Sequence, residues 1–318
     1  MTKPPKLITP DVQPKPFHVA PGLPMGGASY SYTVEELREF VKCKDDPVYF
    51  IRNYVKIISM DKGLIPFDLY DFQEEMVRSF HENRYTITMC SRQVGKSTTV
   101  VGYFLHYILF NVNVRCCISA NKQKVAVDLL GRLKLAYENL PRFLQQGVVR
   151  WARLEIELSN GASVFAAATS SSAVRGGSYN VLLLDEFAFV PDNIANEFYA
   201  STFPTITSGT TTKIIMVSTP NKMNLFHKFW TDAGKKLNDF NPIFVHWSRV
   251  PGRDEAWRQA TIRNIGGPEI FAQEYECVGP ETLVTIRDVI TGSIIILNMN
   301  DLYEKLNPNL LHLQDHPE

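Results

Sequence analysis

The sequence lacks a net charge, an apolar run long enough to cross a membrane, and a regular arrangement of cysteines. Its 318 residues contain 33 Lys and Arg against 33 Asp and Glu, so no global positive field attracts DNA, and nucleic-acid contacts require a local patch or another chain. Five cysteines without metal-type spacing argue against a disulfide framework and indicate a reducing compartment. The Pro- and Lys-rich N-terminus lacks the apolar core of a signal peptide. These absences predict a soluble, cytosolic protein that contacts no membrane.

The pattern of turn residues and apolar runs predicts four parts. Residues 1–30 are rich in Pro and Gly and are expected to form a disordered arm or a segment draped over the body. A capping box at residues 33–36 and a second helical pattern at 46–55 predict a small helical subdomain over residues 31–65. In residues 66–276 strands alternate with helices, which predicts an α/β fold with a mostly parallel sheet. Residues 277–318 differ from the rest and are taken up below.

The expected elements of the α/β part follow from periodicity and turn signals. An Asn160-Gly161 turn predicts that two of the strands form a hairpin. The expected strands are 85–90, 114–119, 154–158, 163–168, a buried strand ending at 185, 213–217 and 243–247, and the expected helices are 98–109, 123–140, 224–232 and 254–265.

A phosphate-binding loop is predicted at residues 90–97, between the expected strand 85–90 and the helix that follows. Gly95 lets backbone N–H groups approach phosphate oxygens, and Lys96 adds a positive charge beside them. The Ser97 hydroxyl is a ligand for Mg²⁺. Cys90 stands where such loops usually carry their first glycine, so this motif alone leaves an ordinary strand-to-helix turn open.

Two adjacent carboxylates, Asp185 and Glu186, end a run of four apolar residues at 181–184. Such a run is typical of a central parallel strand, and ligands gather at the tips of these strands. Asp185 is placed to hold Mg²⁺ and Glu186 to polarise an attacking water. One such pair alone also fits a helix cap, but both motifs in this order predict binding and hydrolysis of ATP.

The motif set resembles the large terminase subunit of tailed bacteriophages, the motor that packages DNA into capsids. The resemblance covers about residues 54–276 and is carried by four segments in the family's order, namely 91–97, 173–176, 185–189 and 218–221. It implies a RecA-like P-loop ATPase domain with helices on both faces of the sheet, preceded by a small helical subdomain.

The resemblance also implies roles for single residues. Arg92 matches an arginine that stabilises charge on the phosphates in cis, and Ser218 and Thr219 match a coupling motif that senses the terminal phosphate. Phe72 and Gln73 resemble an adenine-contacting element. From the residues alone, a plain turn at 218–221 and an ordinary amphipathic helix at 72–73 remain open. Arg175 matches a loop arginine near the nucleotide, with a solvated surface arginine as the alternative. Nucleotide contacts are further implied for Ser91, Gln93, Val94, Gly95, Lys96, Ser97 and Thr98.

The resemblance implies partners as well. Family members act on double-stranded DNA in the host cytoplasm, with a capsid portal and a small terminase subunit, as a homo-oligomeric ring on the portal. They also carry a nuclease domain after the ATPase domain. The 42 residues beyond Glu276 are too few for one, so no nuclease activity is expected of this chain.

The tail from Cys277 resembles the first block of an intein. A nucleophilic Cys is followed by a strand pattern, a turn at Thr291-Gly292, a second strand at 293–297 and a short capped helix at 300–306. The Cys277 thiol is placed to attack the carbonyl of Glu276 and form a thioester. No terminal His-Asn pair follows, which predicts the N-terminal piece of a split intein that splices with a separate chain carrying the C-terminal intein piece and the nuclease. A truncated reading frame, or a linker in which Cys277 is an ordinary thiol, is the alternative.

Three function classes follow. The first is the ATPase of a packaging motor. The second is a helicase-like, nucleic-acid-stimulated ATPase with an unrelated C-terminal tail, although further helicase motifs are not found. The third is a precursor whose chemistry in isolation is protein splicing, which is compatible with the first.

Overall fold

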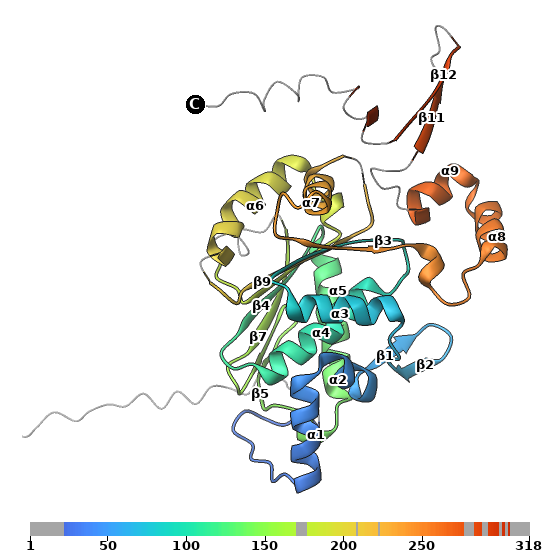
Figure 1. Cartoon of the computed structure of the whole chain (residues 1–318). Coiled ribbons are helices and arrows are strands. Elements are labelled where there is room, and N and C mark those ends of the chain that lie inside the picture. Colours follow the sequence, from blue (N-terminus) through green and yellow to red (C-terminus); the bar gives the residue numbers. More distant parts are fainter. Residues whose placement is uncertain are drawn as a thin grey trace, which may run out of the picture.

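The computed structural model describes residues 22–169, 177–207, 209–221, 223–276, 283–287, 292–298, 301, 302 and 305 (Figure 1). Its body is a large twisted sheet with helices packed on both faces, so the α/β fold class predicted from the sequence is confirmed. Among the described helices, none has the length and apolarity that a membrane crossing requires.

The central sheet has eight strands in the order β10-β3-β9-β8-β4-β7-β6-β5. The six strands from β10 to β7 run parallel to their neighbours, whereas β6 and β5 are antiparallel additions at one edge. All seven expected strands are present with small shifts at their ends, and β5 is a further strand that was not predicted. The bounds are β3 (Tyr85–Cys90), β4 (Arg115–Ala120), β5 (Val148–Trp151), β6 (Glu155–Leu158), β7 (Ser163–Ala168), β8 (Val181–Asp185), β9 (Lys213–Ser218) and β10 (Asn241–Val245).

The central strands are buried on both faces because their alternate side chains enter two separate cores. In β8, Val181 and Leu183 belong to a first core, which they share with the helices of residues 34–138. Leu182 and Leu184 point the other way, into a second core shared with the helices of residues 192–207 and 225–234. The continuous apolar run that predicted a central strand is therefore explained by two-sided burial.

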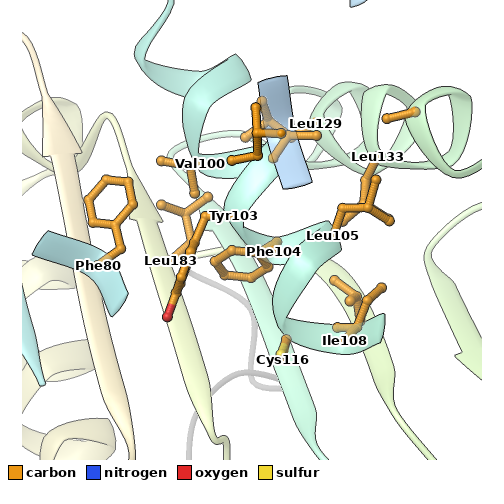
Figure 2. Close-up of a cluster of buried hydrophobic side chains, with 14 of the residues drawn as sticks. Phe80, Val100, Tyr103, Phe104, Leu105, Ile108, Cys116, Leu129, Leu133 and Leu183 are labelled. Carbon is orange, nitrogen blue, oxygen red and sulfur yellow. The ribbon is translucent and has the colours of Figure 1, made fainter. Parts of the chain in front are cut away.

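Helix α4 (Lys96–Phe110) lies in the first core, flanked by α3 (Asp71–Glu82) and α5 (Gln123–Glu138), which also contact the sheet. Figure 2 shows Val100, Tyr103 and Phe104 of α4 packed among side chains of these elements, including Phe80 of α3 and Leu129 of α5. Because α4 is packed on most of its circumference, its first residue, Lys96, is held at a fixed place beside the strand ends.

The N-terminal segment contains α1 (Val34–Asp45), α2 (Pro47–Tyr54) and a hairpin of β1 (Lys56–Ser59) and β2 (Gly63–Pro66) that the sequence pattern did not reveal, and α1 and α2 share the first core with α3 to α5. The predicted capping box is confirmed, because Glu36 N donates to Thr33 Oγ1 at 3.1 Å and Thr33 N donates to Glu36 Oε2 at 2.8 Å. Within the expected arm, residues 24–26 pair with β5 through Val148, and residues 1–21 lie outside the described part.

Of the remaining helices, α6 and α7 pack on the second core, and α8 and α9 follow β10 in the chain. The expected helices near residues 224 and 254 are confirmed, whereas α6 was missed because its sequence is rich in aromatic and β-branched residues and contains Pro204. The α-helices are α6 (Asp192–Thr207), α7 (Leu225–Gly234), α8 (Glu255–Ile265) and α9 (Pro268–Phe271). The short turns are η1 (Arg142–Leu144), η2 (Phe187–Phe189), η3 (Trp247–Arg249) and the π-helical η4 (Ala272–Glu276).

Two antiparallel strands, β11 (Leu283–Arg287) and β12 (Ile294–Asn298), form a separate hairpin after these helices (Figure 1). The predicted turn contains Gly292 with φ +70°. Three consecutive isoleucines of β12, Ile294, Ile295 and Ile296, are exposed, so both faces of this apolar strand are open to solvent.

Buried His106 of α4 predicts a pH dependence of stability. Its Nε2 lies 2.9 Å from the carbonyl of Cys43 and 3.2 Å from that of Lys44, at the end of α1. Burial lowers the pKa of His106 to about 4, below that of an exposed histidine. Because only the unfolded state takes up this proton between about pH 6.5 and pH 4, the free energy of unfolding falls over that range by roughly 3 kcal/mol from this group.

The His106→Gln variant keeps a side-chain N–H donor but does not titrate. We expect chemical denaturation at a series of pH values to give a flatter profile between pH 6.5 and 4 for His106→Gln than for the unmodified chain. Identical profiles would mean that His106 is protonated in the folded protein.

Candidate active site

The predicted phosphate loop connects the end of β3 to the start of α4. Gln93 and Gly95 both have positive φ, +58° and +78°, so the chain turns sharply before Lys96. The positive φ of Gly95 would strain any other residue, and a Cβ atom there would lie 2.5 Å from Gln73 Nε2, so the Gln73 side chain would have to shift. Cys90, in place of the usual first glycine, is still the last residue of β3 and is fully buried, with its Sγ 3.7 Å from the carbonyl of Ser218.

Gln73 of α3 holds this loop through a hydrogen bond. Its Nε2 donates to the carbonyl of Val94 at 3.1 Å, and its Oε1 accepts from Tyr70 N at 3.0 Å. Phe72 is fully buried, with the Arg249 guanidinium 5.6 Å from its ring centroid. The adenine contacts expected of Phe72 and Gln73 stay predictions, and in this structure both residues make contacts within the protein.

Asp185 ends β8 in a buried position beside the loop. Strands β3 and β8 both pair with β9, one on each side, so their carboxyl ends lie one strand apart at the same edge of the sheet. Ser97 Oγ donates to Asp185 Oδ1 at 3.5 Å. Burial raises the pKa of Asp185 to about 6, and the Lys96 charge opposes this shift.

Glu186 connects the loop to the end of β9. Its Oε1 lies 2.7 Å from Lys96 Nζ. Its Oε2 accepts from Ser218 Oγ at 3.3 Å, from Thr219 N at 3.2 Å and from Thr219 Oγ1 at 3.3 Å. Glu186 has φ +51°, a left-handed conformation that costs energy for a non-glycine residue and that aims the carboxylate back across β9.

Lys96 is the buried cation of this cluster. Burial by itself would lower its pKa, but the attraction of neighbouring groups, including Glu186 and Asp185, raises it above the ordinary value. Lys96 is therefore held in its charged form, which the predicted role in phosphate binding requires.

The oxygen atoms of Ser97 and Asp185 fit a magnesium ion. Mg²⁺ is bound in proteins by one or two hard oxygen ligands together with waters and substrate phosphates. Ser97 Oγ and Asp185 Oδ1 lie 3.5 Å apart beside the predicted phosphate loop, so they fit the two protein ligands of such a magnesium site.

The structure brings the predicted residues Ser91 to Thr98, Asp185, Glu186, Ser218 and Thr219 into one region. Arg92 belongs to the loop, but its guanidinium pairs with Glu274 of η4. Arg175 and Cys277 lie outside the described residues.

Three residues at this site were not anticipated. Arg253 donates to the carbonyls of Arg92 and Gln93, Glu274 pairs with Arg92, and Arg132 of α5 reaches Thr98 Oγ1 at 3.4 Å. None lies in a recognisable motif, and only the tertiary fold reveals them.

A family model described as "Terminase large subunit, T4likevirus-type, N-terminal" matches residues 87–286 of this chain, well over half of its length. The chain belongs to this terminase family. The match includes most of β3, the predicted phosphate loop and the Asp185-Glu186 strand end.

Solved terminase structures show the same fold. The HK97 bacteriophage large terminase is 14% identical with a TM-score of 0.57, covering 76% of this chain and 56% of that chain. A Thermus phage large terminase ATPase domain is 19% identical with a TM-score of 0.53, covering 66% and 93%. The large terminase of a thermophilic bacteriophage, in complex with ATP-gamma-S, is 10% identical with a TM-score of 0.52, covering 79% and 75%. The terminase chain described here thus spans little more than half of the HK97 protein.

Gln73 provides a test of how the loop of this terminase is held. In Gln73→Met, the buried Val94 carbonyl and the partly buried Tyr70 N lose their partner, so the free energy of unfolding should fall by about 1–3 kcal/mol. Nucleotide affinity should fall as well, because the loop loses its support.

Glu82→Ala, on the exposed last turn of α3, is the matched control and should leave both quantities nearly unchanged. Denaturant titration and equilibrium nucleotide binding measure the two effects. Unchanged stability and affinity in Gln73→Met would show that the loop holds its shape without Gln73.

Proposed function

We propose that this chain is the ATP-hydrolysing motor domain of a phage DNA-packaging terminase. The observation that carries the proposal is the meeting of Lys96 with Glu186, and of Ser97 with Asp185, at strand ends on either side of β9. Family membership and the fold shared with a terminase solved in complex with ATP-gamma-S support it.

In this proposal Lys96 and the loop backbone bind the phosphates, while Ser97 and Asp185 hold Mg²⁺, which neutralises phosphate charge when bound. The terminal phosphate competes with Glu186 for the Lys96 ammonium. Glu186 Oε1, freed from the lysine, accepts a proton from the water that attacks the terminal phosphorus, and the bond to the ADP oxygen breaks. Arg92 and Arg175 are the proposed arginines that stabilise the developing charge.

The second oxygen of Glu186 provides the proposed coupling route. Ser218 and Thr219 contact Glu186 Oε2, and Ser218 Oγ also accepts from Ala188 N at 3.2 Å. The segment between β9 and α7 also contacts Ala188, because Asn221 and Asn224 both donate to the carbonyl of Ala188. A shift of Glu186 during hydrolysis therefore moves the start of α7, which gives the Ser-Thr pair a physical basis as a sensor.

The partners of the proposed motor are double-stranded DNA, a capsid portal and a small terminase subunit, with the chain in a homo-oligomeric ring in the host cytoplasm. The helicase-like alternative predicts stimulation of ATP turnover by free single strands. The packaging motor predicts stimulation by portal-bearing capsids with double-stranded DNA, and a comparison of the two separates the proposals.

The role of Glu186 is tested by Glu186→Gln. The amide keeps the size of the side chain but cannot take a proton, so ATP turnover should fall by several orders of magnitude while nucleotide binding stays nearly intact. Lys96→Ala is the comparison variant, and it should lose binding as well as turnover. Steady-state hydrolysis and equilibrium binding measure both, and normal turnover in Glu186→Gln would remove Glu186 from the mechanism.

We further propose that Cys277 begins an intein that splices this terminase segment to a separate chain carrying the C-terminal intein piece and the nuclease domain. Support comes from the sequence pattern and from the hairpin β11–β12, which has the predicted strands and turn. A two-stranded hairpin with exposed isoleucines is marginal alone and suits a larger β-fold completed by further strands. The family match extends to residue 286, so it does not mark the junction.

Splicing is tested by mixing this chain with candidate C-terminal fragments and measuring the products by mass. The expected product joins residues 1–276 to the partner and lacks residues 277–318. Cys277→Ala should give no product because the thioester cannot form. Equal amounts of product with and without the Cys277 thiol would contradict the proposal, as would no ligation with any cognate fragment.

A further inference from the structure

Glu274 and Tyr275 of η4 contact the phosphate loop, although they are about 180 residues distant in sequence. Arg92 N donates to the carbonyl of Glu274 at 3.2 Å, and the Arg92 guanidinium pairs with the Glu274 carboxylate. Ser91 Oγ donates to the carbonyl of Tyr275. The loop therefore contacts η4 through both backbone and side chains.

Arg253 fixes the same part of the loop from another direction. Its guanidinium donates to the carbonyls of Arg92 at 3.2 Å and of Gln93 at 2.9 Å. It also lies 4.8 Å from the ring centroid of Trp257, and Tyr275 packs against Trp257. These contacts involve backbone atoms of the loop, so they hold the main chain of residue 92 whichever way its side chain points.

The side chain of Arg92 is held much less firmly than its backbone. The Arg92 side chain is 51% exposed and that of Glu274 is 23% exposed, and ion pairs with such access to water contribute little. Among the described residues, the structure records no ion pair between Arg92 and Asp185 or Glu186. The ion pair with Glu274 thus keeps the Arg92 guanidinium away from the Lys96–Glu186 pair. This contact is weak, whereas the main chain of residue 92 is fixed.

We infer that Glu274 is a positioning residue that holds the Arg92 guanidinium away from the phosphate site until a terminal phosphate competes for it. A phosphate offers more negative charge than a carboxylate and accepts a bidentate pair from arginine, so the exchange is favourable once a triphosphate is bound. Only the side chain needs to move, because the backbone contacts of residue 92 are independent of it. The inference rests on the proposed nucleotide site and adds the residue that regulates access of Arg92 to it.

This arrangement makes a specific prediction for Glu274→Gln in the full chain. Removing the carboxylate charge frees Arg92, so the Kd for a non-hydrolysable ATP analogue, β,γ-imido-ATP, should fall about two- to fivefold, the range expected for a partly exposed ion pair. The Kd for ADP should stay the same, because ADP lacks the phosphate that Arg92 would reach. In steady-state hydrolysis KM should fall with little change in kcat.

The Arg92→Ala background separates this role from a structural one. If Glu274 acts through Arg92, then Glu274→Gln should have no effect on either Kd when Arg92 is already alanine. Glu269→Gln, which removes an exposed carboxylate on the adjacent helix α9, is the matched control for the change in net charge and should leave both Kd values unchanged.

Three results are decisive. An equal shift for ADP and the analogue, a shift that persists in the Arg92→Ala background, or no shift at all in a folded Glu274→Gln protein would each overturn the inference. Failure of the unmodified chain to bind either nucleotide would instead overturn the proposed function. Thermal denaturation of each variant verifies that it is folded.

Discussion

The ion pair between Lys96 and Glu186 is the interaction on which the rest of the site depends. It joins the first residue of α4 to the residue after β8, across the strand β9 that separates β3 from β8. The pair exists because both strand ends lie at the same edge of a parallel sheet and because Glu186 adopts a left-handed backbone conformation. A buried lysine is tolerated there only with anionic partners, which in a nucleotide site are exchanged for phosphates.

Helix α4 and the loop around this ion pair are fixed by apolar packing and by hydrogen bonds, respectively. Helix α4 is fixed by the first core, and the loop before it is held by the Gln73 amide on one side and by Arg253 on the other. Both hold the loop through its main-chain carbonyls and engage none of its N–H groups, the kind of group that binds anions at such loops. Glu186, Ser218 and Thr219 form the side of the site that leads to α7, and Arg92 and Glu274 form the side that leads to η4.

Much of the fold was predictable from local pattern. Strands buried on both faces give continuous apolar runs such as residues 181–184, and helices such as α1 begin at clear capping signals. The strand β5, the hairpin β1–β2 and helices α6 and α9 were missed, and α3 was anticipated only as an alternative at residues 72–73. In α6, aromatic residues that pack against the second core override weak helix propensity, and this packing is known only from the tertiary fold.

In the site, the loop and the two carboxylates were predictable because each motif is contiguous in the sequence. Glu274, Arg253 and the burial of Phe72 were not, because they depend on packing between segments far apart in sequence.

The most direct measurement is a crystal structure of the chain with magnesium and β,γ-imido-ATP. The account predicts that Lys96 Nζ leaves Glu186 and contacts the phosphates, that Ser97 and Asp185 lie at the metal, and that Glu186 Oε2 stays with Thr219. A nucleotide bound elsewhere, or bound while Lys96 remains paired with Glu186, would contradict the account.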